Sequence, residues 1–166
     1  VDQLLLLARF ENQKQNIKNE SIYLNAIILD NLTRFSEKIE SKKIKIFTSF
    51  TDDYYIQSDN YLVSIIISNL LSNAIKYSDS TGEIRIKLSQ NEHHITFSIS
   101  DNGIGIAPDD MNKIFNSFYR SDVINHAQIK GTGLGLSIVK RLCDLLKFEI
   151  SVDSKLNVGT TFSLSF

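Results

Sequence analysis

At 166 residues, the chain is long enough to form one domain with a hydrophobic core. Its hydrophobic fraction of 42%, charged fraction of 22% and net charge of −1 are typical of a soluble globular protein and predict no basic face for nucleic acid. One cysteine excludes an internal disulfide and a cysteine-rich zinc site. The apolar runs are too short for a membrane span and no signal peptide is evident, so we expect a soluble, cytoplasmic domain.

The first elements along the chain are a helical remnant and an amphipathic helix. A run of leucines at 4–7 with Phe10, followed by polar residues, predicts the end of a helix and then a linker. We therefore expect residues 1–16 to belong to a preceding helical domain and residues 17–166 to form the main domain. Apolar residues at helical spacing predict a helix over Leu24–Glu40, and alternation predicts a strand over Ile44–Phe50.

The middle of the chain predicts the longest helix and a β-hairpin. Asn60–Tyr77 carries one continuous apolar band at helical spacing. Two segments of alternating character follow, Glu83–Leu88 and Ile95–Ser100, with a turn at Asn91–Glu92 between them. Two alternating segments joined by such a turn are typical of paired antiparallel strands.

The last third of the chain predicts two helices and two strands. Pro108, followed by two acidic residues, is typical of the first turn of a helix. Tyr119–Thr132 is predicted as a loop, Leu134–Leu146 as a helix, and Phe148–Val152 and Thr160–Phe166 as strands. Most sheet pairs are expected to be hairpin-linked. This pattern predicts an α+β, two-layer sandwich in which a mixed, mostly antiparallel sheet packs against about three helices.

Polar residues interrupt the apolar band of the long helix. Asn69 and Asn73 lie four residues apart, so they share one helix face, and Lys76 follows near that face. Amide oxygens suit magnesium bound to phosphates, and a lysine offers a point charge to a phosphate. Two surface asparagines with local hydrogen bonds are the alternative.

Asp101–Ile106 places an acid at a strand end, followed by Gly103 and Gly105. Glycines allow close backbone approach to a ligand, and a carboxylate accepts a hydrogen bond from an exocyclic amine. An ordinary tight turn is the alternative explanation of this segment.

Three alternating glycines, Gly131, Gly133 and Gly135, open the helix that follows the predicted loop. Free N–H groups and the helix dipole make such a helix start an anion site. The spacing fits neither a P-loop nor a Rossmann fingerprint, and a flexible hinge is the alternative. Phe115 and Phe118, spaced by three at an expected helix end, are either anchors of the loop or ordinary core aromatics.

In this order and spacing, the four motifs resemble the N, G1, F and G2 boxes of the histidine-kinase catalytic domain. That domain belongs to the ATPase superfamily that includes gyrase, Hsp90 and MutL, and the resemblance implies its Bergerat ATP-binding fold. Gly159–Phe162 is similar to the last glycine element of the family. The resemblance covers residues 21–166, and residues 4–15 are similar to the tail of the preceding dimerisation and phosphotransfer domain.

The resemblance implies a role for each matching position. Asn69 and Asn73 would hold Mg²⁺, Asn73 and Lys76 would have the catalytic role, and Asp101 would bind the adenine amine. Phe115, Phe118 and Tyr119 would form the hinge of an ATP lid. The implied ATP-binding positions are Asn69, Asn73, Lys76, Tyr77, Asp101, Gly103, Ile104, Gly105, Ile106, Phe118, Arg120, Lys130, Gly131, Thr132, Gly133, Leu134, Gly135, Leu136 and Thr160.

The resemblance also implies an activity, cofactors and partners. The domain would bind Mg-ATP and donate the γ-phosphate to a histidine on a separate dimerisation and phosphotransfer domain, with a response regulator receiver domain downstream. The full-length protein would be a homodimer without a nucleic-acid partner, and sensors of this kind include membrane-anchored proteins. A different ATPase or serine kinase of the superfamily, or an inactive interaction module of the same fold, are the alternatives.

Overall fold

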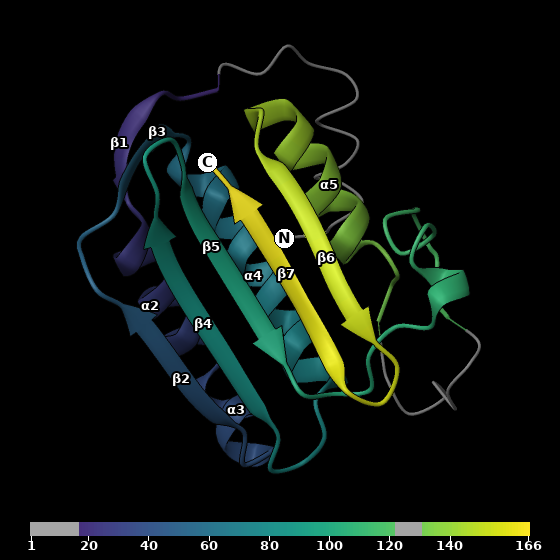
Figure 1. The fold of residues 1–166 in the computed structure, drawn as a ribbon. Helices are drawn as coiled ribbons and strands as arrows, with labels where there is room; N and C mark the ends of the chain where they lie inside the picture. The colour runs from purple at the N-terminus through teal and green to yellow at the C-terminus, as the bar shows by residue number, and fades with distance from the viewer. Residues whose placement is uncertain (1–16, 122–130) are drawn as a thin grey trace.

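The computed structural model describes residues 17–121 and 131–166 and shows two layers, a five-stranded sheet and a layer of helices on one of its faces (Figure 1). The strands are β1 (Glu20–Tyr23), β2 (Lys45–Phe50), β3 (Tyr55–Ser58), β4 (Glu83–Gln90), β5 (Ile95–Asp101), β6 (Glu149–Lys155) and β7 (Gly159–Ser165). The helices are α2 (Leu24–Arg34), α3 (Ser36–Ser41), α4 (Asn60–Tyr77) and α5 (Gly135–Leu146), with a 3₁₀ turn η1 (Pro108–Asp110). The predicted two-layer α+β sandwich is confirmed.

The main sheet has the strand order β2-β4-β5-β7-β6 and is mixed as predicted. β2 and β4 are parallel because the chain crosses over through α4 between them, whereas the other neighbouring strands are antiparallel. Along each strand of this sheet, every second side chain points into the helical layer, and these side chains are mostly apolar and buried. They include Ile84, Ile86, Leu88, Phe97, Ile99, Phe162 and Leu164.

α4 is the central helix of the second layer and lies between α2 and α5 (Figure 1). The Asp59 side chain caps its first turn by accepting hydrogen bonds from the N–H groups of Tyr61 and Leu62, both 3.1 Å. At the other end, Lys42 Nζ donates to the carbonyl oxygens of Ile75, Lys76 and Ser78 at 2.8, 3.1 and 2.8 Å. Both ends of the helix are therefore fixed, which holds its polar face in place.

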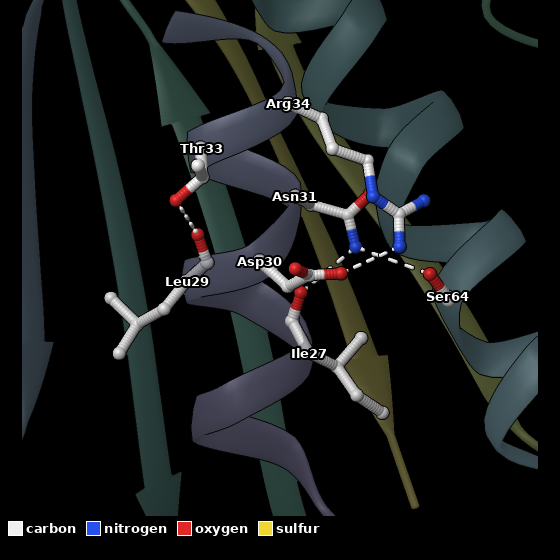
Figure 2. Close-up of polar contacts among 7 residues, drawn as sticks. All are labelled: Ile27, Leu29, Asp30, Asn31, Thr33, Arg34 and Ser64. Carbon is white, nitrogen blue, oxygen red and sulfur yellow. Dashed lines mark hydrogen bonds and ion pairs between the residues drawn. The ribbon is translucent and has the colours of Figure 1, made fainter.

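α2 packs against α4 through a buried polar contact as well as through apolar side chains (Figure 2). Asn31 is fully buried, and its Nδ2 donates to the Ile27 carbonyl at 2.8 Å and to Ser64 Oγ at 3.3 Å. Among the described residues, no donor reaches its Oδ1. The exposed Asp30–Arg34 pair beside it contributes little stability.

The structure differs from the predicted elements in three places. The helix predicted over Leu24–Glu40 is two helices, because the backbone leaves helical geometry at Phe35 (φ −95°, ψ 4°). β1 and β3, which pair with each other in a small antiparallel sheet, were not predicted. Pro108 opens one 3₁₀ turn followed by further turns, so the expected helix there was wrong. The N–H groups of Met111, Lys113 and Asn116 donate to the carbonyl group three residues back, which is the hydrogen bond of a 3₁₀ turn.

Residues 1–16 lie outside the described part of the chain, so the predicted helical remnant and the domain boundary stay predictions. Within residues 17–121 and 131–166, no helix combines the length and apolar character that a membrane crossing requires.

Candidate functional site

The end of β5 and the start of β7 lie side by side in the sheet (Figure 1). Asp101 and Thr160 from these two strand ends line a pocket. Its cavity volume is about 110 Å³. Ten residues predicted from the motifs line it, from α4, the segment after β5, the loop start, α5 and β7. They are Asn73, Tyr77, Asp101, Ile104, Gly105, Ile106, Tyr119, Arg120, Leu136 and Thr160.

The asparagines of α4 turn their oxygens toward the start of α5. Asn69 Nδ2 donates to the Ile65 carbonyl at 2.9 Å, so its Oδ1 points away from the helix backbone. A Cβ added to Gly135 would lie 3.0 Å from Asn69 Oδ1 and 4.0 Å from Asn73 Oδ1. Glycine at 135 thus leaves room for two amide oxygens at one place.

These amide oxygens are the available ligands for a hard cation. No cluster of three or more His, Cys, Asp or Glu side chains that could hold a metal occurs in the described segments. Magnesium is usually held by one or two protein oxygens together with waters and substrate phosphates. Asn69 and Asn73 fit such a site, in which most ligands come from the nucleotide.

Positive charge gathers beside this pair. Burial lowers the pKa of Lys76, and the nearby Arg120 and Lys38 lower it further. The Lys76 ammonium lies 5.5 Å from the centre of the Tyr77 ring and reaches Gly131, where an added Cβ would be 2.1 Å from Nζ. A half-buried ammonium group whose pKa is lowered by neighbouring cations favours the binding of an anion.

The N-terminus of α5 adds backbone donors to this region. Leu134 occupies the N-cap position, and no side chain of the described residues caps the first turn. The first N–H groups of a helix lack intrahelical partners, and the helix dipole is positive there. The predicted anion site at Gly131–Gly135 therefore lies next to the asparagine oxygens and the lysine.

Asp101 is the one acidic residue among those that line the pocket. Burial raises the pKa of its carboxyl group, and hydrogen bonds from the N–H groups of Gly103 (2.9 Å to Oδ1) and Thr160 oppose the rise. Asn102 stabilises the turn, since its Oδ1 accepts a hydrogen bond of 2.8 Å from the Glu83 N–H. The carboxylate is thus a fixed acceptor in the pocket.

The structure explains the glycines after β5 by backbone packing. A Cβ at Gly103 would lie 2.2 Å from the Tyr77 carbonyl oxygen, at the end of α4. A Cβ at Gly105 would lie 2.1 Å from the Lys155 carbonyl oxygen, and Gly105 has a φ of +67°. Both glycines let the segment fit between α4 and the β6–β7 hairpin; their contact with a nucleotide stays a prediction.

The predicted hinge residues have different surroundings. Phe115 packs against the hydrophobic core, whereas the Phe118 side chain is 64% exposed and does not line the pocket. The Phe118 N–H donates to the Gly133 carbonyl at 2.9 Å, so the two ends of the predicted lid meet. Residues 122–130, and with them Lys130, lie outside the described residues.

The remaining predicted ATP-binding positions within the described residues do not line the pocket. They are Asn69, Lys76, Gly103, Phe118, Gly131, Thr132, Gly133, Leu134 and Gly135.

Sequence reasoning missed two polar side chains that hold the site together. The sequence predicts that Asp110 stabilises the first turn of a helix through the helix dipole. In the structure its buried carboxylate accepts hydrogen bonds from the hydroxyl groups of Tyr119 (2.5 Å) and Ser121. Ser154, near the end of β6, contacts both the segment after β5 and Thr160. No motif in the sequence indicates these side-chain hydrogen bonds, because the partners are separated along the chain and meet only in the fold. The pocket-lining residues that were not predicted are Ala107, Ile114, Ser121, Leu156 and Phe162.

Comparisons with known proteins agree with this geometry. Residues 58–166 match the family described as histidine kinase-, DNA gyrase B- and HSP90-like ATPase. The chain is 32% identical to the sensor protein RprX of Bacteroides fragilis over 99% of this chain, which spans 32% of the length of RprX.

Two solved structures are similar to the chain. The mycobacterial sensor histidine kinase MprB superposes with a TM-score of 0.78 at 26% identity, over 89% of this chain and 96% of the other. Full-length ShkA, solved in complex with AMPPNP, superposes with a TM-score of 0.86 at 25% identity, over 99% of this chain and 34% of the other. Together with the family match over most of the chain, the four motifs and the pocket they form show that this chain belongs to the histidine kinase-, DNA gyrase B- and HSP90-like ATPase family.

Proposed function

We propose that this chain is the catalytic domain of a sensor histidine kinase, which binds Mg-ATP and donates the γ-phosphate to a histidine on a separate dimerisation and phosphotransfer domain. The observation that carries the proposal is the shared pocket of Asn73 and Asp101, with the start of α5 beside the asparagine oxygens. The AMPPNP complex of the similar protein ShkA supports a nucleotide as the ligand.

In this proposal one part of the pocket binds the adenine base and another binds the phosphates. Asp101 accepts a hydrogen bond from the adenine amine, and Ile104, Ile106 and Leu136 offer apolar contact to the base. At the other end, Lys76 and Arg120 neutralise phosphate charge together with the N–H groups of α5. Phosphoryl transfer depends mostly on such positioning and charge stabilisation.

Magnesium held by Asn69 and Asn73 would supply further charge neutralisation at the phosphates. The asparagine oxygens face the start of α5, so in this proposal the metal and the helix dipole act on the same phosphates.

The phosphate acceptor comes from elsewhere. His93 and His94 lie in the exposed β4–β5 turn, at the opposite end of β5 from Asp101. In this proposal the acceptor histidine belongs to the preceding domain of a homodimeric protein, and a response regulator receives the phosphate afterwards. The domain works in the cytoplasm as part of a sensor protein.

Isothermal titration calorimetry with ATP and magnesium tests the proposal. We expect binding by the wild-type protein, and loss of it in Asn73→Ala and Asp101→Asn, with Lys87→Met on the exposed sheet face as a control that binds normally. No binding at millimolar ATP would favour an inactive interaction module.

Radiolabelled ATP separates the remaining candidates. With a phosphotransfer domain added, we expect an acid-labile phosphohistidine on that domain and negligible labelling of this chain alone. Acid-stable phosphoserine would indicate a serine kinase of the superfamily, and slow phosphate release without any acceptor would indicate a conformational ATPase.

A further inference from the structure

Ser154 occupies a point where three polar groups converge behind the pocket. Its Oγ lies 2.9 Å from the Ile106 nitrogen, 2.9 Å from the Gly159 carbonyl oxygen and 2.8 Å from Thr160 Oγ1. Ser154 and Thr160 face each other in the antiparallel β6–β7 pair. Thr160 is only 8% exposed and lines the pocket, whereas Ser154 does not.

The hydrogen atoms of these two hydroxyl groups can be assigned from their partners. A hydroxyl group has one hydrogen to donate and two lone pairs that accept. The Gly159 carbonyl can only accept, so the Ser154 hydrogen goes there, and the Ile106 N–H can only donate, which uses one Ser154 lone pair. The remaining contact then requires that Thr160 donates to the second lone pair of Ser154.

This assignment determines what Thr160 offers to a ligand. Its hydrogen points to Ser154, so its free lone pairs are left for the pocket. Thr160 also pairs with Asp101 in the β5–β7 register, so the hydroxyl oxygen and the carboxylate lie on neighbouring strands of one site. The base end of the pocket therefore presents two acceptors and, from Thr160, no donor.

We infer that Ser154 is a positioning residue for purine selection: by holding the Thr160 hydroxyl group as an acceptor beside Asp101, it makes the pocket select a purine with an amino group at position 6 over one with a carbonyl group. The inference rests on the proposed binding of ATP. The 6-amino group of adenine has two hydrogens to donate, whereas a 6-carbonyl oxygen would face two acceptors. Unpaired acceptors in a buried site are costly, so such a site discriminates strongly.

Ser154→Ala tests the inference with ATP and inosine triphosphate, which carries a 6-carbonyl group in place of the amino group. Without Ser154, the Thr160 hydroxyl group is free to rotate and to donate to the carbonyl. We expect the ratio of the two dissociation constants to fall about tenfold, the effect of one hydrogen bond of roughly 1.4 kcal/mol. Ser154→Thr keeps the hydroxyl group and should restore the ratio, and Ser151→Ala, on the exposed face of β6, should leave it unchanged.

Calorimetric titrations of both nucleotides distinguish a failure of the selectivity role of Ser154 from a failure of the proposed ATP binding. An equal change of both affinities in Ser154→Ala, with the ratio intact, would overturn the selectivity role while leaving ATP binding in place. If Ser154→Ala does not fold, Thr160→Val takes its place, because it removes the hydroxyl group directly; an unchanged ratio there would also overturn the inference. No ATP binding by the wild-type protein would instead refute the proposed function, and this inference with it.

Discussion

Replacing Gly103 or Gly131 with alanine introduces nearly the same overlap at two places, but the consequences should differ. At Gly103 the new Cβ would lie 2.2 Å from the backbone oxygen of Tyr77, and at Gly131 it would lie 2.1 Å from the Nζ of Lys76. The first neighbour belongs to the end of a buried helix, whereas the second is the tip of a flexible side chain. Whether the neighbour is rigid backbone or a flexible side chain therefore decides how much stability each substitution costs.

For Gly103→Ala, the two backbone segments must separate by roughly 0.8 Å, the difference between 2.2 Å and the 3.0 Å that real Cβ atoms keep. Overpacking of this kind costs about 1–3 kcal/mol. The separation also breaks the hydrogen bond from the Ile104 N–H to the Tyr77 carbonyl, which contributes about 1 kcal/mol. A loss of about 2–4 kcal/mol corresponds to a fall in melting temperature of roughly 5–15 °C for a domain of this size.

Gly131→Ala should leave the melting temperature within about 2 °C of the wild type, because the lysine side chain can rotate away. Its expected effect is weaker ATP binding, since the displaced ammonium leaves the asparagine side of the site. Differential scanning fluorimetry without nucleotide measures the first quantity, and calorimetry with ATP the second. Equal destabilisation by the two substitutions, or a fully stable Gly103→Ala protein, would refute the reasoning.

Three further predictions concern single side chains. Burial raises the pKa of Asp101 above its usual 3.8, so the folded state loses stability as pH rises from that value through the raised pKa. Asp101→Asn should therefore keep or raise the melting temperature at pH 7 without nucleotide. A lower melting temperature would contradict the conclusion that the buried charge destabilises the fold. Burial raises the pKa of the fully buried Cys143 to about 12, so Ellman's reagent should react at pH 8 only after denaturant is added, and rapid reaction of the native protein would contradict the buried position. Lys42→Met removes the ammonium that binds three carbonyl groups at the end of α4 and should cost about 1–3 kcal/mol in urea unfolding, whereas the exposed Lys87→Met should cost less than about 0.5 kcal/mol.

The sequence predicts an element correctly where the apolar residues of that segment alone recur at a clear helical or strand spacing. α4 was predicted to the residue, because its apolar band is long and because buried positions recur at helical spacing through both of its ends. β1 and β3 have only four residues each and pair solely with one another within the described residues. Short strands without clear alternation give no usable period, so their existence follows from tertiary packing alone.

The same distinction holds for the candidate site. Spacing alone placed Asn69 and Asn73 on one helix face, and the fold brings that face to the start of α5. The packing role of Gly103 could not be predicted, because it depends on the carbonyl group of Tyr77, on another element. Asp110 illustrates the converse: local chemistry suggested a helix start, but its carboxylate instead accepts hydrogen bonds from hydroxyl groups 9 and 11 residues further along the chain.

The hydrogen bond between the Phe118 N–H and the Gly133 carbonyl has a consequence for how this family of domains can vary. It ties the two ends of the intervening sequence to one point on the body of the protein. The entropy of closing such a segment grows only logarithmically, so doubling its length costs only about 0.6 kcal/mol. A longer or shorter stretch between Phe118 and Gly133 would therefore change the free energy of folding by only a few tenths of a kcal/mol to about 1 kcal/mol.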